Sequence, residues 1–365
     1  MGAVEVIILH PLPPPDAGPL ERILADARAE LAARNRAGFM AAGATRARIV
    51  AGTADGHPFG ARLRALLADL APGRGLVLLG SGALPLATAA DRAAFVEAAA
   101  AGDNRALANN GYSADVVALS AWAVTTLADL PAEFPADNAL PRWLQEVAGV
   151  PLADLRTRWR LAVDFDSPLD VILVGRSRRR SGRSRGLVDD AAVKRIDARC
   201  GVIQRVLADP GAELVVAGRT SAATIGWLER RARCRVRIVV EERGLRASSR
   251  LALGDPTSDK GRPPRSVLGM VLERDGPAAL GARLAELGDA ALVDSRVLLA
   301  DRLGADEDRW PRPESRFASD LLDPRSVEDA WLAALTQAAV AAPIPVLLGG
   351  HTLVGPGVRL IAGGR

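Results

Sequence analysis

The chain is poor in aromatic residues, cysteine and histidine, and it contains no long uninterrupted hydrophobic run. Of its 365 residues, 4% are aromatic, two are cysteines and three are histidines. Two cysteines without a C-x-x-C spacing exclude a disulfide scaffold, and no apolar run reaches the ~18 residues that a membrane span requires. A charged fraction of 25% excludes a disordered tail protein. We therefore expect a globular cytoplasmic protein in a reducing compartment, without a membrane partner.

The first residues, MGAVEVIILHP, lack the basic region of a signal peptide and predict a first buried strand instead. Hydrophobic residues make up 49% of the chain. With so few aromatics they are mainly Ala, Leu and Val, which fill helices and buried strands. The length is near twice that of a domain of ~150 residues, so we expect two domains. Cores of this size need neither a metal nor a disulfide for stability.

Arginine supplies nearly all of the positive charge, because Lys194 and Lys260 are the only lysines among 47 basic residues. Residues 176–185, RSRRRSGRSR, hold six arginines, and without them the formal charge of +4 would become −2. One interpretation is a solvated linker between domains. The alternatives are phosphate contacts with nucleic acid or a clamp over an anionic ligand. No aromatic residues are interleaved for base stacking, so we favour the linker and expect no nucleic-acid partner.

Short apolar runs alternate with helical periodicity along the first half of the chain. The predicted strands are 4–9, 47–51, 75–80, 115–121 and 159–165, and the predicted helices are 20–34, 59–70, 89–101 and 141–148. This alternation is typical of an α/β domain with a mainly parallel sheet.

The second half repeats the alternation with a different sequence. The predicted strands are 213–217, 236–240, 267–272, 291–300 and 345–348, and the predicted helices are 189–207, 222–233, 277–287 and 326–341, with a polar loop at 254–265. The fold class is therefore α/β with two domains, each a mainly parallel sheet flanked by helices. We place the domains at 1–178 and 179–365, with the arginine-rich joint at 176–186.

A cluster of carboxylates follows the last predicted strand of the first half, in the sequence WRLAVDFDSPLD at 159–170. Asp164 and Asp166 are two residues apart, so on a strand they share one face and can bind Mg²⁺ through oxygen. The alternative is structural: Ser167 or Asp166 caps a helix that begins at Pro168, with Asp170 in its first turn. Both interpretations stay open.

This stretch, together with GLVLLGSGALPLAT at 75–88, resembles the nucleotidyltransferases of the GT-A fold, above all molybdenum cofactor guanylyltransferases and phospholactate guanylyltransferases. The resemblance covers roughly 75–175. It implies a GT-A-like first domain, Mg²⁺ held by Asp164, Asp166 and Asp170, and a nucleotide or phosphorylated small molecule as ligand. The second domain looks Rossmann-like and resembles no family that we can name.

Two departures from that family favour a catalytically inactive binding or scaffold protein as the alternative. Ala83 stands where the family carries a metal-binding Asp. The sequence HPLPPPDAGPLER, at 10–22, replaces the glycine-rich phosphate loop, and its prolines remove backbone N–H donors. If the chain does bind a nucleotide, Arg22 or Ser81 then lies near the phosphates.

Further polar residues are candidates for binding phosphate or nucleotide. Asn109 and Asn110 lie in a polar loop before the apolar run at 115–121, and the others, which follow predicted strands, are Ser81, Arg219, Thr220, Ser221 and His351. Open α/β sheets bind ligands at the carboxyl ends of their strands, and helix N-termini there favour anions. The alternatives are an Asn-Gly turn at 110–111, a helix cap at 220–221 and a structural histidine.

Four charged residues near predicted strand or helix ends, Asp294, Arg296, Arg316 and Asp320, either line the same pocket or form surface ion pairs. The lead hypothesis is a Mg²⁺-dependent nucleotidyl- or glycosyl-transferase whose catalytic residues stay unassigned. An unrelated activity of the second domain and assembly into a homo-oligomer remain open.

Overall fold

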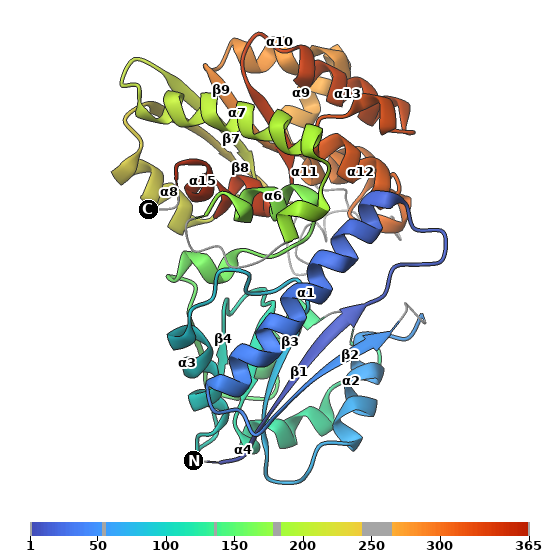
Figure 1. Ribbon diagram of the computed structural model, residues 1–365, viewed down its shortest axis with the longest axis vertical. Coiled ribbons are helices and arrows are strands. Elements are labelled where there is room, and N and C mark those ends of the chain that lie inside the picture. The colour runs from blue at the N-terminus through green and yellow to red at the C-terminus, as the bar shows by residue number, and fades with distance from the viewer. Residues whose placement is uncertain (1, 53–55, 135–136, 178–183, 243–264, 364–365) are drawn as a thin grey trace, which may run out of the picture. The chain divides into compact units, whose positions relative to one another are not determined.

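The computed structural model describes residues 2–52, 56–134, 137–177, 184–242 and 265–363. It divides the chain into two compact units. The first unit comprises Met1–Ala17 and Leu24–Phe165, and the second comprises Gly18–Ile23 and Asp166–Arg365. Each unit contains one β-sheet flanked by helices (Figure 1), which confirms the predicted α/β class with two sheets.

The first unit is built on a six-stranded mixed sheet with the order β2-β1-β3-β5-β4-β6. Its strands are β1 (Val4–Pro11), β2 (Arg46–Gly52), β3 (Gly75–Gly80), β4 (Ala106–Ala108), β5 (Val116–Leu119) and β6 (Leu152–Asp154). Its helices are α1 (Pro19–Ala41), α2 (Phe59–Ala68), α3 (Ala89–Ala99), α4 (Ala121–Thr125) and α5 (Leu140–Glu146), with 3-10 turns η1 (Thr126–Asp129), η2 (Asp137–Ala139) and η3 (Trp159–Ala162). The first residues of α1, up to Ile23, are assigned to the second unit.

One strand of this sheet, β5, runs antiparallel to both of its neighbours, β3 and β4. The short connection between β4 and β5 explains its direction, because a parallel crossover needs about a dozen residues or more. An alternation of strands and helices in the sequence does not reveal this reversal. The first sheet is therefore mixed, and three of its five strand pairings are parallel.

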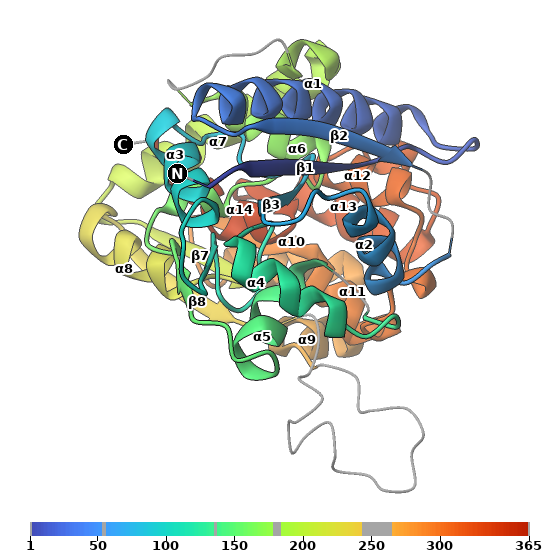
Figure 2. The ribbon, with the colours of Figure 1, turned by 90° about the horizontal axis from the view of Figure 1, so that it is seen from below.

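Side chains from the two faces of the first sheet pack into separate hydrophobic clusters, because successive residues of a strand point to opposite faces. Val6 and Ile8 of β1 pack with Phe39 of α1 and Phe95 of α3. Ile7 lies in the other cluster, with residues of α2, α4 and α5. Figure 2 shows α1 on one side of β1 and β2, with α2 and α4 on the other.

The second unit is built on a four-stranded parallel sheet with the order β10-β9-β7-β8. Its strands are β7 (Glu213–Gly218), β8 (Arg235–Val240), β9 (Ala290–Asp294) and β10 (Val346–Gly349). Its helices are α6 (Pro168–Gly175), α7 (Asp190–Ala208), α8 (Ala222–Arg231), α9 (Val267–Asp275), α10 (Leu280–Ala285), α11 (Ser295–Leu303), α12 (Pro313–Asp320), α13 (Ala330–Ala341), α14 (His351–Val354) and α15 (Gly357–Ile361), with 3-10 turns η4 (Ser184–Leu187), η5 (Pro277–Ala279), η6 (Glu307–Arg309) and η7 (Pro324–Ser326).

The strand order of the second sheet creates a topological switch point. From β7 the chain passes to β8 on one side, and it later returns to β9 on the other side. In open α/β sheets, ligands bind where the strand order reverses, at the carboxyl ends of the strands. The carboxyl ends of β7 and β9 therefore mark the place to look for a site.

Three of the predicted strands take another form. Residues 159–165 form the turn η3 and a single bridge between Asp164 and Ala83. Residues 267–272 lie in α9, where the side chain of Ser266 accepts a hydrogen bond from the N–H of Gly269. The strand predicted at 291–300 ends at Asp294, whose side chain caps α11. A short apolar run does not distinguish a strand from a buried helix. The capping side chains at its ends therefore determine which of the two forms.

Two segments that the sequence marks as unusual, the arginine-rich stretch and the long polar loop, lie largely outside the described residues. They are the core of the arginine-rich stretch, 178–183, and most of the polar loop, 254–264. Arg176, which follows α6, is described, and its Nη1 lies 2.6 Å from Asp197 Oδ1. Among the helices of the described ranges, none has the length and apolar character to cross a bilayer.

The packing of β3 generates a stability prediction. A Cβ at Gly75 would lie 1.9 Å from the backbone oxygen of Ala99, whereas a Cβ at Gly80 would meet no atom within 4 Å. We expect Gly75→Ala to lower the free energy of unfolding by about 2–3 kcal/mol, because the backbone of α3 must shift. Gly80→Ala is the matched control, with an expected change within about 0.5 kcal/mol. Urea unfolding measures both, and equal effects would contradict the prediction.

Candidate functional site

Loops that follow three neighbouring strands of the second sheet carry its polar residues. They are residues 218–221 after β7, 294–296 at the end of β9 and 349–351 after β10. The register of the parallel strands brings the ends of β9 and β10 together, with Gly349 opposite Asp294. The switch point and the neighbouring strand end thus form one polar edge.

An arginine–carboxylate pair occupies the switch point itself. Arg219 Nε lies 2.6 Å from Asp294 Oδ2, and Arg219 Nη2 lies 3.1 Å from Asp294 Oδ1. Gly218 permits this approach, since it has φ +127° and a Cβ there would lie 2.2 Å from Asp294 Cβ. Burial acts to lower the pKa of Arg219, but Asp294 and then Asp166 outweigh it and raise the pKa. The guanidinium therefore keeps its positive charge at the sheet edge.

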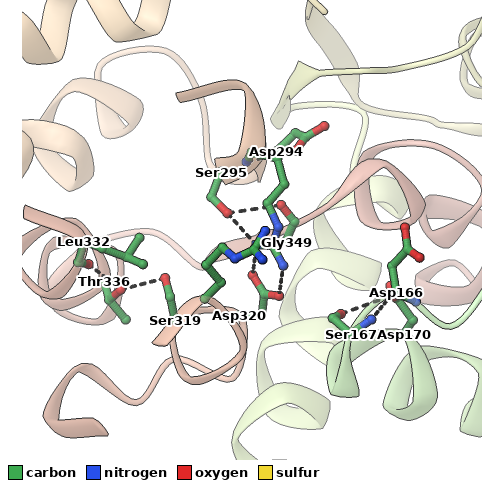
Figure 3. A network of polar contacts seen from close by, with 12 residues as sticks. Asp166, Ser167, Asp170, Asp294, Ser295, Ser319, Asp320, Leu332, Thr336 and Gly349 are labelled. Carbon is green, nitrogen blue, oxygen red and sulfur yellow. Dashed lines mark hydrogen bonds and ion pairs between the residues drawn. The ribbon is translucent and has the colours of Figure 1, made fainter. Parts of the chain in front are cut away.

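A second, fully buried ion pair lies beside the first. Arg296 Nη1 and Nη2 each lie 2.6 Å from a carboxylate oxygen of Asp320 in α12. Arg296 Nη1 also donates to Ser295 Oγ, at 2.9 Å, and that hydroxyl donates to the backbone oxygen of Gly349, at 3.2 Å. Burial opposes the charge, but the Asp320 carboxylate raises the pKa of Arg296. Figure 3 shows Ser295, Asp320 and Gly349 converging, so this network joins the ends of β9 and β10 to α12.

A carboxylate and an imidazole meet near these pairs. Asp166 Oδ2 lies 3.6 Å from His351 Nδ1, and the side chains are 54% and 31% exposed. This distance is too long for a hydrogen bond. Gly349 and Gly350 precede His351, and a Cβ at Gly350 would lie 3.9 Å from Arg219 Nη2. Both side chains of the pair are therefore partly open to solvent. The Arg219 guanidinium lies close to the glycine backbone that precedes His351, because no side chain comes between them.

The start of α6 fixes the backbone of Asp166. Asp170 Oδ2 accepts hydrogen bonds from the N–H of Asp166, at 3.0 Å, and from the N–H of Ser167, at 2.7 Å (Figure 3). Ser167 Oγ also donates to it, at 3.0 Å, and Pro168 begins the helix. Ser167 is thus the N-cap of α6 and Asp170 lies in its first turn, as the structural alternative predicted.

Asp166 and His351, both in the second unit, offer donors that could hold a metal ion, and Asp170 is not among the donors found beside them. Asp164 is buried near the end of the first unit. Only one residue separates Asp164 from Asp166, so the chain itself keeps the two carboxylates close.

The other two candidates of the second unit, Thr220 and Ser221, have structural partners. Thr220 Oγ1 donates to the backbone oxygen of Val354, at 3.0 Å. Ser221 is the N-cap of α8 and accepts from the N–H of Thr224, at 3.2 Å. The capping alternative therefore holds for Ser221, and Thr220 connects the loop after β7 to α14.

The candidates in the first unit stabilise its loops. Asn109 donates to Asp115 Oδ2 and to the backbone oxygen of Leu161, at 3.0 and 2.9 Å. Asn110 accepts from the N–H of Tyr112, at 3.0 Å, as the Asn-Gly turn implies. Ser81 Oγ lies 3.1 Å from His10 Nδ1.

Sequence reasoning missed the pairing of His10 with Ser81 and the burial of Arg296 with Asp320. The signal for the first pair is their position, because each directly ends or follows one of two neighbouring parallel strands, β1 and β3. No comparable signal identifies Asp320 as the partner of Arg296, since the two lie on separate helices. Charged residues near helix ends are usually surface pairs.

A cavity of about 270 Å³ lies elsewhere in the second unit. It is lined by Leu207, Trp227, Arg231, Ala232 and Ala362. The C-terminal ends of α7 and α8 border it, and these ends lead into the amino ends of β7 and β8. The cavity therefore lies at the other edge of the sheet from the polar site.

The buried pair generates a prediction about stability. Asp320→Asn leaves the charge of Arg296 buried without a counter-charge, so we expect the free energy of unfolding to fall by about 3–5 kcal/mol. Glu273→Gln, which breaks the solvent-exposed contact with Arg265, is the control and should change stability little. Chemical denaturation measures both variants, and a loss below about 1 kcal/mol for Asp320→Asn would refute the assigned role.

His10 generates a prediction about pH. Burial, and then the charge of Arg28, lower the pKa of His10 below its ordinary value near 6.5, while Asp26 opposes them. A depressed folded-state pKa means that the neutral ring favours the fold, so this contribution is complete above about pH 6.5 and is lost as the pH falls toward the folded pKa. His10→Gln should flatten the dependence of unfolding free energy on pH between about 7 and 5. An unchanged slope in His10→Gln would count against this assignment.

Comparison of the chain with known proteins finds no matching family model, no matching curated protein and no matching solved structure. The resemblance to GT-A nucleotidyltransferases therefore stays a prediction from the residues quoted for it. A functional proposal starts from the polar edge of the second sheet.

Proposed function

We propose that the chain binds a divalent metal ion at the carboxyl edge of its second sheet and uses it to bind a nucleotide or a phosphorylated small molecule. The single observation that carries this proposal is the position of Asp166 and His351. Their donor atoms lie 3.6 Å apart beside the switch point. Both side chains are partly exposed, so a ligand has access to them.

The charges of the surrounding residues support a cation at this place. Arg219 and Asp294 neutralise each other through their bidentate contact. Arg296 and Asp320 do the same. Asp166 brings a carboxylate to within 3.6 Å of the His351 ring, and a carboxylate beside an imidazole is a donor pair for a divalent cation.

The same arrangement suits a phosphorylated ligand. A metal ion bound here neutralises phosphate charge and orients the phosphate oxygens. Asp294 holds the guanidinium of Arg219 in one orientation at this edge. The Gly349–Gly350 backbone leaves room for close approach of a ligand. These are positioning and electrostatic tasks, which dominate nucleotidyl and phosphoryl transfer, and they fit the transferase hypothesis that the sequence suggests.

A ligand-binding protein without transfer chemistry is the second candidate. Ala83 favours it, because the resemblance implies a metal-binding carboxylate at this position. The described backbone of Ala83 pairs with Asp164 in an isolated bridge. Under this candidate the ligand binds with the same metal dependence, but no nucleotidyl group is transferred.

Thermal shift with the full-length chain tests the proposal. We expect the melting temperature to rise by about 3 °C or more when a nucleoside triphosphate and a divalent chloride (MgCl₂, CoCl₂ or ZnCl₂) are present together at many times their dissociation constants. Asp166→Ala and His351→Ala should lose the rise, because they remove the donors. His57→Ala is the matched control at an exposed histidine and should keep it.

Two results would sink the proposal. One is that GTP, CTP and ATP all leave the melting temperature unchanged with every metal. The other is that Asp166→Ala and His351→Ala respond like the wild type. Release of pyrophosphate in the presence of an acceptor separates the transferase from the non-catalytic binding protein.

A further inference from the structure

We infer that the site of Asp166 and His351 prefers a nitrogen-accepting transition ion of the Zn²⁺ or Co²⁺ type over Mg²⁺. The inference rests on the proposed function for the location of the metal. It goes beyond that function in naming the class of ion, and it departs from the Mg²⁺ that the sequence predicts.

The donor set is the first argument. Mg²⁺ selects oxygen ligands and keeps much of its water, so an imidazole adds little to its binding. Imidazole nitrogen suits Zn²⁺, Co²⁺ and Ni²⁺, whose affinities for mixed nitrogen and oxygen sites exceed those of the harder ions. His351 faces Asp166 through Nδ1, the nitrogen whose distance to the carboxylate is 3.6 Å. A site of this composition is therefore selective for the softer ions.

The separation of the donors is the second argument. With bonds of about 2.1 Å, donors 3.6 Å apart subtend roughly 118° at a shared ion. Adjacent ligands of an octahedral Mg²⁺ subtend about 90° and lie about 3.0 Å apart. The observed separation is closer to a tetrahedral arrangement, which Zn²⁺ adopts readily.

The supports of the two donors are the third argument. Asp166 is held through its N–H by the Asp170 carboxylate. His351 begins α14 directly after the end of β10, which Ser295 holds through the Gly349 oxygen. The backbone positions are thus fixed from separate elements, while the partial exposure of both side chains leaves coordination positions for water or a ligand. Sites with open positions are catalytic or ligand-binding rather than purely structural.

Metal titration of the full-length chain, stripped with a chelator, tests the inference. We expect Zn²⁺ and Co²⁺ to bind at least about 100-fold more tightly than Mg²⁺, measured by competition with a chromophoric chelator and by calorimetry. His351→Ala should weaken Zn²⁺ and Co²⁺ binding by about 10-fold or more with little effect on Mg²⁺. Asp166→Asn should weaken all three ions, and His57→Ala should match the wild type.

The visible spectrum of bound Co²⁺ supplies a readout that does not depend on activity. Bands of a low-coordinate ion with a nitrogen ligand are expected in the wild type, and His351→Ala should shift or abolish them. Equal affinities for Mg²⁺ and Zn²⁺, or a Co²⁺ spectrum that is unchanged in His351→Ala, would overturn the inference and leave the proposed metal-dependent ligand binding intact. If no divalent ion binds and no nucleotide raises the melting temperature, the proposed function fails as well.

Discussion

The buried contact between Arg296 and Asp320 is the interaction on which the second unit's polar edge depends. Two opposite charges buried to this degree are stable only if each satisfies the other, and the two 2.6 Å contacts do so. Through Ser295 the same arginine fixes the backbone at Gly349, where β10 ends. The strand end that carries His351 is therefore positioned by a charge pair that is almost wholly buried. Any ligand at this edge meets a preorganised backbone.

Arginines act in the same way elsewhere in the described structure, often by donating to backbone oxygens. Arg199 donates to the oxygens of Ala339 and Val340 at the C-terminal end of α13. In the first unit, Arg158 and Arg160 bind the buried Asp91. Burial alone would raise the pKa of Asp91, but the hydrogen bonds from Arg160, Thr88 and Arg158 hold it below its usual range. A chain with few lysines thus uses planar guanidinium groups, with several donors each, to connect its loops.

The two units share one topological device. In each sheet the first strand in the sequence lies between the next strand on one side and a later strand on the other. At this switch point the first unit places His10 and Ser81, 3.1 Å apart. The second unit places Arg219 and Asp294, 2.6 Å apart. The pairs differ chemically, and the charged pair of the second unit adjoins exposed metal-ligand candidates. This difference is why the functional proposal concerns the second sheet.

The sequence by itself determined the α/β class, most of the strands and helices, and the candidacy of Asp166 and His351, because hydrophobic periodicity and strand-end polarity are local properties. Tertiary structure alone decided that β5 is antiparallel and that residues 267–275 are helical, since loop length and capping outweigh a short apolar run. It also decided that Ser167 and Asp170 form the capping box of α6 and that His351 lies beside Asp166. Residues far apart in sequence meet only when parallel strands align their carboxyl ends, and no local pattern records which strands will be neighbours.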